Sequence, residues 1–155
     1  MTAVKIGAPI PDFSVPSTQG EFSAADLKGK MTVLYFYPKD NTPGCTTESQ
    51  NFRDAQAEFE AAGAQIIGVS RDSLGSHERF IDKPGLTFPL LADTEERLCE
   101  LFGVMKMKNM YGKQVRGIER STFLIDAQGV LIQEWRGIKV PGHVQAVLQA
   151  VQQTA

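Results

Sequence analysis

Residues 31–48, MTVLYFYPKDNTPGCTTE, contain a strand pattern, a polar loop and the start of a helix. The run at 31–37 is rich in β-branched and aromatic residues, which is typical of a strand covered on both faces. Thr42 is of a residue type preferred at the N-cap of a helix, and Pro43 suits the first helical position. The stretch therefore predicts a buried strand whose carboxyl end delivers Cys45 into the first turn of a helix.

The predicted position of Cys45 favours a reactive thiol. A side chain in the first turn of a helix faces backbone N–H groups that have no acceptor within the helix. Those donors and the positive end of the helix dipole favour the thiolate, which is the nucleophilic form. The alternative is an inert core cysteine, the more common role of a free cysteine. The polar loop before Cys45 favours the reactive interpretation, and Glu48 three residues later excludes a CxxC redox pair.

The segment after Cys45 extends the pattern to a βαβ unit. Apolar residues recur at helical spacing up to Ala62, and Gly63 supplies a stop signal. Residues 64–70, AQIIGVS, have the composition of a second central strand. A strand, a helix and a strand in this order predict a parallel pair joined by a crossover, and hence an α/β fold.

The remaining segments alternate in the same way. We expect an edge hairpin and connector before residue 31 with a tight turn at 26–29, helices at 76–81, 95–102 and from 142 onward, and strands at 88–92, 121–126 and 130–135. Residues 104–119 hold three methionines and four basic residues and are expected to form an exposed loop or hairpin near the site. A soft-metal site in that segment is the less favoured alternative.

Composition limits the class of protein. A chain of 155 residues with a formal net charge of -2 is most simply one domain, and it lacks the positive field that general nucleic-acid binding needs. Pro9, Pro11 and Asp12 interrupt any secretory signal, and no apolar run reaches the ~18 residues of a membrane span, so we expect a cytoplasmic protein. The two cysteines are too few for a disulfide scaffold. His77 and His143 lack the paired spacing of a zinc site and are expected at the surface or as helix caps.

The chain resembles the peroxiredoxins. Pro38, Thr42 and Cys45 match their active-site pattern P-x-x-x-T-x-x-C. The segments FYPKDNTPGCTTE, ADTEERLCELFGV and RSTFLID follow the order of the Q-type branch, also called the bacterioferritin comigratory proteins. This resemblance implies one thioredoxin-like domain over residues 1–155, a three-layer α/β/α fold with a central mixed sheet. It also implies a monomeric antioxidant enzyme that reduces hydrogen peroxide and organic hydroperoxides with thiols, without a metal or other cofactor.

The site residues have distinct expected roles. Cys45 is the nucleophile, and its own N–H and that of Gly44 are donors at the helix start. The Thr42 hydroxyl is expected to bond the peroxide, and Pro38 to shield the sulfur from water. By resemblance, Arg120 is the cation that holds both thiolate and substrate, a role that suits its permanent charge and fixed donors. Composition alone would leave Arg120 as an ordinary surface charge at a strand end.

Glu48 is the residue that opposes this arrangement. A carboxylate one helical turn after Cys45 disfavours the thiolate unless it is turned away or engaged with Arg120. Its alternative role is a simple helix charge near the N-terminus, which the dipole favours. We therefore expect Glu48 either to support the site through a hydrogen bond or to be an unspecialised helix residue.

The sequence departs from its relatives at the resolving position. Many Q-type members carry a second cysteine five residues after the first, where this chain has Gln50. Cys99 is the other thiol, and its apolar neighbours predict a core residue rather than a resolving one. We therefore expect a one-cysteine cycle, in which a thioredoxin, a glutaredoxin or a small thiol reduces the Cys45 sulfenic acid.

Two other functions remain open from the sequence. A thiol-disulfide oxidoreductase would normally need a vicinal cysteine pair. A non-enzymatic redox sensor would use Cys45 oxidation to change contacts with a partner protein. A sensor stops after one turnover, so steady-state peroxide consumption distinguishes it from an enzyme.

Overall fold

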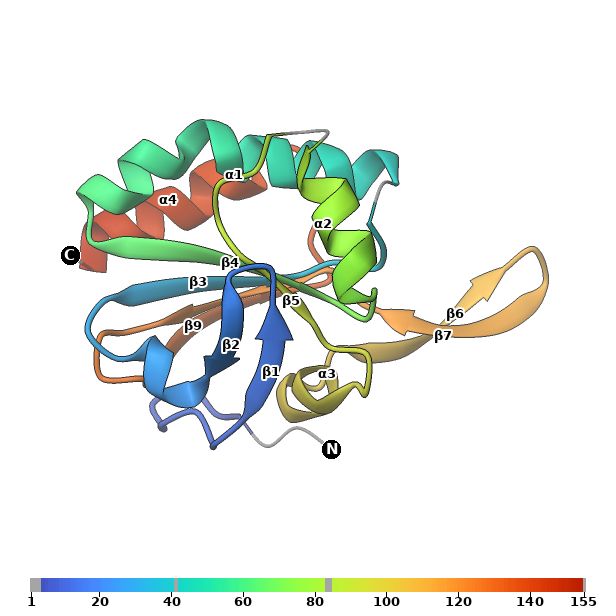
Figure 1. The fold of residues 1–155 in the computed structure, drawn as a ribbon, viewed down its shortest axis with the longest axis horizontal. Coiled ribbons are helices and arrows are strands. Elements are labelled where there is room, and N and C mark those ends of the chain that lie inside the picture. The colour runs from blue at the N-terminus through green and yellow to red at the C-terminus, as the bar shows by residue number, and fades with distance from the viewer. Residues whose placement is uncertain (1–3, 41, 83–84, 155) are drawn as a thin grey trace.

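A computed structural model describes residues 4–40, 42–82 and 85–154 and shows a central mixed sheet between two layers (Figure 1). The strands of the main sheet lie in the order β2-β1-β5-β4-β3-β8-β9. The three strands β3, β4 and β5 run parallel, and β8 pairs antiparallel with β3. Their bounds are β1 Ser14–Ser17, β2 Gly20–Ser23, β3 Met31–Phe36, β4 Ala64–Ser70, β5 Leu90–Ala92, β8 Ser121–Ile125 and β9 Leu131–Arg136. The predicted α/β fold with a mixed sheet is confirmed.

The helices cover the two faces of the sheet unequally. Three of them, α1, α2 and α4, lie on one face, while α3 lies on the other beside the β1–β2 edge (Figure 1). The bounds are α1 Pro43–Ala61, α2 Leu74–Asp82, α3 Arg97–Phe102 and α4 His143–Thr154, with a short 3-10 helix at Ala24–Leu27. No helix among the described residues combines the length and apolarity that crossing a membrane requires.

Strand β3 separates two apolar cores because its side chains alternate between the faces. Val33 and Tyr35 belong to the core under α1 and α4, together with Cys45. Leu34 and Phe36 belong to the core under α3. All six residues of β3 are buried, as the run of apolar and aromatic residues predicts for a central strand.

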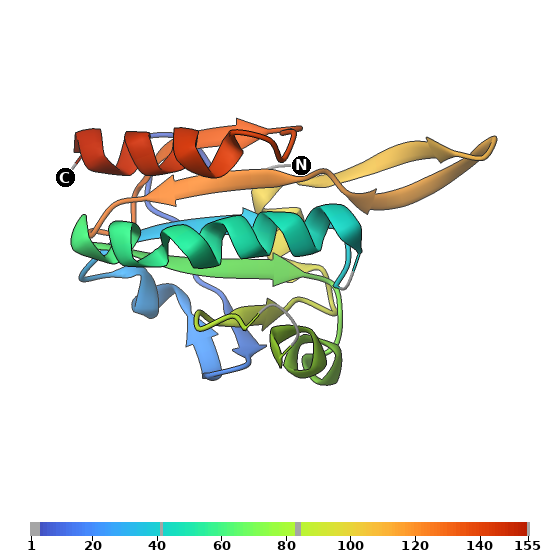
Figure 2. The ribbon, with the colours of Figure 1, turned by 90° about the horizontal axis from the view of Figure 1, so that it is seen from above.

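A separate hairpin departs from the body of the domain. Its strands, β6 Met105–Met110 and β7 Lys113–Ile118, pair only with each other among the described residues. Figures 1 and 2 show it extending outward at the end of the molecule where α1 begins. Of the two alternatives for residues 104–119, the hairpin is the correct one.

Three predicted local details differ from the structure. The first half of the turn expected at 26–29 belongs to the 3-10 helix at 24–27, where the carboxylate of Asp26 accepts from the N–H of Ser23 at 2.8 Å. Helix α2 begins at Leu74 rather than Ser76, because the Ser73 hydroxyl accepts from the N–H of Ser76 at 3.2 Å. The strand expected from residue 88 begins at Leu90, after Pro89.

Candidate active site

Cys45 lies in the first turn of α1, as the sequence predicts. Thr42 occupies the N-cap position with extended backbone, and Pro43 is the first helical residue. The Thr42 side chain does not cap the helix, because its hydroxyl donates to the carbonyl oxygen of Lys39 at 2.9 Å. The first-turn N–H groups of Gly44 and Cys45 have no acceptor within the helix, which makes them candidate donors for the thiolate or a substrate.

Arg120 connects the site across a long sequence separation. It immediately precedes β8, whose first residue pairs with the end of β3, and this pairing brings it over the start of α1. Its Nη2 donates to Cys45 Sγ at 3.3 Å, and its Nη1 donates to Glu48 Oε1 at 2.6 Å. A Cβ on Gly44 would lie 3.3 Å from the same Nη2, so glycine leaves the space that the guanidinium occupies.

Glu48 is engaged with the arginine. Its side chain is fully buried, and within the described part of the chain Oε2 has no hydrogen-bond partner. Burial raises the pKa of Glu48 to about 7, although Arg120 opposes that rise. Near neutral pH the carboxyl is thus partly protonated, which reduces the negative charge that it places beside the cysteine.

Tyr35 is a site neighbour that the sequence analysis missed. Its hydroxyl lies 2.8 Å from Ser49 Oγ, one residue beyond Glu48, and its ring stacks on Phe52 of α1. Gly68 of β4 makes room for this ring, since a Cβ there would approach the Tyr35 ring to 2.9 Å. The alternation of β3 puts Tyr35 on the α1 face, but that signal does not reveal its hydrogen-bond partner.

Pro38 follows the end of β3 and is half-buried. Cys45 itself is 1% exposed. Arg120, Glu48, Gly44 and Cys45 therefore form one contact group, with Pro38 and Thr42 on the loop that leads into it.

Comparison with known proteins assigns the chain to a family. Residues 6–134 match the AhpC/TSA family. The chain belongs to this family, among the peroxiredoxins. It is 50% identical to Peroxiredoxin Bcp of Xanthomonas campestris, over 97% of this chain and 96% of that protein. It is 51% identical to Peroxiredoxin Bcp of Bacillus subtilis, over 96% of this chain and 95% of that protein.

Solved structures confirm the fold of this peroxiredoxin. The X. campestris bacterioferritin comigratory protein, studied for its alkyl peroxide reduction activity, superposes with a TM-score of 0.89 at 47% identity. The superposition covers 99% of this chain and 98% of that one. The predicted thioredoxin-like peroxiredoxin fold is confirmed, and the chain is a thiol-dependent peroxidase.

The second cysteine of this peroxiredoxin lies on the other face of the sheet. Cys99 is fully buried in the α3 core, whereas Cys45 belongs to the α1 core. Asp93 accepts from the N–H groups of Leu98 and Cys99 at 3.1 and 2.8 Å and so caps α3. Burial, and secondly Asp93, raise the pKa of the Cys99 thiol. The expected burial of Cys99 on a helix face is confirmed, and the structure does not bring the two sulfurs together.

Both histidines are buried, so their predicted surface or capping positions are wrong. His77 Nδ1 lies 2.7 Å from Asp40 Oδ2, and its Nε2 lies 2.8 Å from the carbonyl oxygen of Leu91. The same Asp40 carboxylate accepts from Tyr37 at 2.6 Å and from Ser76 at 2.8 Å. These bonds connect Tyr37 and Asp40, which lie between β3 and α1, to α2. A single histidine gives no periodic signal, so the sequence could not reveal this partner set.

His143 begins α4 and faces β8. Its Nε2 lies 2.7 Å from Thr122 Oγ1, and its side chain is 6% exposed. Burial lowers the pKa of His143 to about 4, with a further lowering by the Arg120 guanidinium. His143 is therefore neutral in the folded protein at pH 7.

Glu48 and His143 make opposite contributions to the pH dependence of stability. The ordinary pKa of Glu48 is 4.5 and its folded value is about 7, so between these values the folded state binds more protons. Stability from this group therefore falls as pH rises from about 4.5 to 7. The ordinary pKa of His143 is 6.5 and its folded value is about 4, so its contribution rises with pH from about 4 to 6.5. Each change is worth about 3 kcal/mol, and the two nearly cancel between pH 4.5 and 6.5.

Single variants should expose each contribution. Glu48→Gln removes the group whose contribution falls with pH, so the difference in unfolding free energy between this variant and wild type should rise as pH rises. For His143→Gln the same difference should fall as pH rises. Urea unfolding at several pH values measures both, and the double variant should again follow the wild-type slope. Parallel curves for all four proteins would contradict the assigned pKa shifts.

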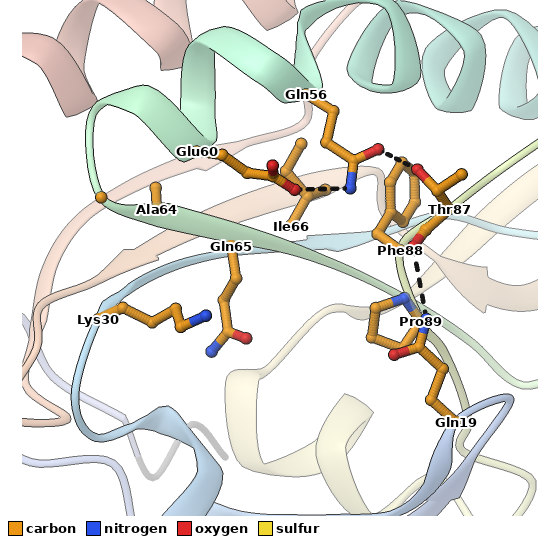
Figure 3. A pocket seen from close by; sticks show the side chains of 11 residues that line it. Gln19, Lys30, Gln56, Glu60, Ala64, Gln65, Ile66, Thr87, Phe88 and Pro89 are labelled. Carbon is orange, nitrogen blue, oxygen red and sulfur yellow. Dashed lines mark hydrogen bonds between the residues drawn. The ribbon is translucent and has the colours of Figure 1, made fainter.

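A groove of about 520 Å³ lies away from this site (Figure 3). It is lined by Lys30 and Ala64 at the amino ends of β3 and β4, whereas Cys45 follows the carboxyl end of β3. Three of its polar side chains bond one another, with Gln56 between Glu60 and Thr87. The groove and Cys45 therefore lie at opposite ends of β3.

Proposed function

We propose that Cys45 is the peroxidatic cysteine of a one-cysteine peroxidase cycle, with Arg120, Thr42, Gly44 and Pro38 as its site. The observation that carries this proposal is the 3.3 Å hydrogen bond from Arg120 Nη2 to Cys45 Sγ in the first turn of α1. A permanent cation and free backbone donors at one sulfur stabilise the thiolate and any charged oxygen beside it.

The first step is attack of the Cys45 thiolate on the terminal oxygen of a hydroperoxide. An S–O bond forms, the O–O bond breaks, and the departing oxygen takes up a proton to leave as water or an alcohol. Arg120 and the N–H groups of Gly44 and Cys45 stabilise the negative charge on the departing oxygen. The Thr42 hydroxyl donates to Lys39 and so offers its oxygen as an acceptor for the peroxide hydrogen.

The second step is reduction of the Cys45 sulfenic acid by an external thiol. The thiol forms a mixed disulfide and releases water, and a second thiol then frees the cysteine as an external disulfide forms. The position of Cys99 across the sheet supports an external resolver. A bulky thiol reaches the enclosed Cys45 sulfur only if the first turn of α1 moves.

The expected reductants are a thioredoxin, a glutaredoxin or a small thiol. We also propose that the protein acts as a monomer in the cytoplasm, supported by its resemblance to Q-type members. Sedimentation velocity of the reduced protein tests the monomer, and a dimer at micromolar concentration would refute it.

Steady-state kinetics test the proposed cycle against its rivals. With excess dithiothreitol, peroxide consumption should continue for many turnovers per protein. Consumption that stops after one equivalent would instead identify a redox sensor. Reduction of insulin without added peroxide would identify a thiol-disulfide oxidoreductase.

A further inference from the structure

The β6–β7 hairpin concentrates positive charge and exposed apolar surface beside the active site. Its residues 105–118 include four cations and no acidic residue, in a chain whose net charge is -2. Four large hydrophobic side chains are exposed among the described residues, and three of them are in this hairpin: Met107 at 60%, Tyr111 at 99% and Val115 at 42%. A protruding surface that is both basic and apolar fits a protein partner of opposite charge.

The turn at the tip of the hairpin exposes the aromatic ring of Tyr111. Tyr111 has φ 55° and Gly112 has φ 80°, so both central turn residues are left-handed. Such a turn favours asparagine followed by glycine, and a bulky residue at its first position is strained. This chain therefore has an exposed tyrosine where asparagine would suit the backbone better.

Two of the four cations of the hairpin already have a partner within the described chain, and two do not form an ion pair there. Arg116 is paired with Glu96, and Lys108 donates to the carbonyl oxygen of Ile118 at 2.6 Å. Lys106 and Lys113 are exposed, and neither forms an ion pair with another residue of the described chain. These two lysines therefore supply the free positive charge.

The base of the hairpin is continuous with the site. Strand β7 ends at Ile118, two residues before Arg120, and the N–H of Glu119 donates to Val104 at 2.7 Å to close the base. Burial and the Arg120 guanidinium lower the pKa of Lys108, while the Cys45 sulfur acts in the opposite direction. Lys108 therefore lies within the electrostatic field of the active site.

The length of the arm suits a small protein. Lys113 lies seven residues before Arg120, which in a strand corresponds to roughly 23 Å. A compact domain of about 100 residues has a radius of gyration of ~13 Å and is wide enough to touch both the arm and Cys45.

We propose that the β6–β7 hairpin is the docking surface for an acidic protein that carries the reducing thiol. This inference rests on the proposed function, because it names the partner for the second step of the cycle. The two lysines steer the partner, and Tyr111 and Met107 supply apolar contacts.

The test compares two reductants on the same enzyme. Peroxide consumption is measured with a thioredoxin of acidic isoelectric point, recycled by its reductase and NADPH, and separately with dithiothreitol. Lys106→Glu/Lys113→Glu should lower kcat/KM for the thioredoxin at least tenfold at low salt, and the salt dependence of wild type should be lost. Turnover with dithiothreitol should stay within twofold.

Two further variants separate docking from folding and from net charge. Tyr111→Asn suits the turn backbone and should still lower kcat/KM for thioredoxin. Lys28→Glu/Lys30→Glu makes the same change in net charge at exposed positions away from the arm and should leave both reductants unchanged.

The outcomes distinguish the two proposals. No turnover of wild type with either reductant would refute the proposed function. Turnover with dithiothreitol alone, or equal thioredoxin kinetics in wild type and both hairpin variants, would overturn the docking surface. If the hairpin variants keep the wild-type thioredoxin kinetics but sediment differently, the hairpin contacts a second copy of this chain instead. If they keep those kinetics but bind a DNA duplex differently, the hairpin contacts nucleic acid instead.

Discussion

Replacing Cys45 with serine is expected to reduce peroxide consumption by at least roughly 10³-fold, to the level of the free reductant. A serine hydroxyl in the same helix turn remains protonated near pH 7, so the donors of Arg120 and the helix start have no anion to stabilise. The serine is close in size to the cysteine, so the fold should be retained. Steady-state peroxide loss with dithiothreitol measures the effect.

Cys99→Ser is the matched control. It removes the other thiol, on the opposite face of the sheet, and should leave the turnover rate within about twofold once the variant is shown to be folded. If Cys99→Ser has the circular dichroism spectrum of the wild type but a much lower turnover rate, the second cysteine takes part in the cycle.

Arg120→Lys should lower the rate of Cys45 oxidation by about 10²-fold, as loss of one charge-stabilising donor typically does. The guanidinium holds Cys45 and Glu48 through two separate nitrogens, and a single ammonium cannot reproduce that fork. Stopped-flow measurement of the reduced protein with hydrogen peroxide gives the second-order rate constant.

A second pair of variants separates chemistry from stability. Arg120→Met leaves the buried Glu48 without its cation and raises the pKa of Glu48 further, so a cost of about 3 to 5 kcal/mol is expected at alkaline pH, where the carboxylate is ionised. Arg120→Met/Glu48→Gln removes the buried charge as well and should recover stability without recovering activity. Recovery of the oxidation rate in the double variant would show that Arg120 only supports the fold.

The sequence predicts the parts of this protein that depend on local patterns. The apolar run of β3 and the Thr42-Pro43 start of α1 each identify their element from neighbouring residues alone. The same signals place Cys45 correctly in the first helical turn. The resemblance to Q-type members adds Arg120, which no local pattern would connect to Cys45.

The contacts that complete the site depend on tertiary structure. Glu48 and Arg120 are 72 residues apart, so only the pairing of β3 with β8 brings them together. The burial of His77 against Asp40 likewise requires α2 to pack beside the loop between β3 and α1. The Thr42 hydroxyl donates to the carbonyl oxygen of Lys39, three residues earlier, instead of capping the helix. In each case the residue type is compatible with several hydrogen-bond partners, and only the tertiary structure determines which one is used.

Peptide mapping after one equivalent of peroxide tests the central claim most directly. The reduced protein is oxidised in the presence of dimedone, which traps sulfenic acids, and is then digested under conditions that preserve disulfides. A one-cysteine cycle should give a dimedone adduct on Cys45 and leave an unmodified thiol at Cys99. A Cys45–Cys99 disulfide as the main product, or first oxidation at Cys99, would contradict it.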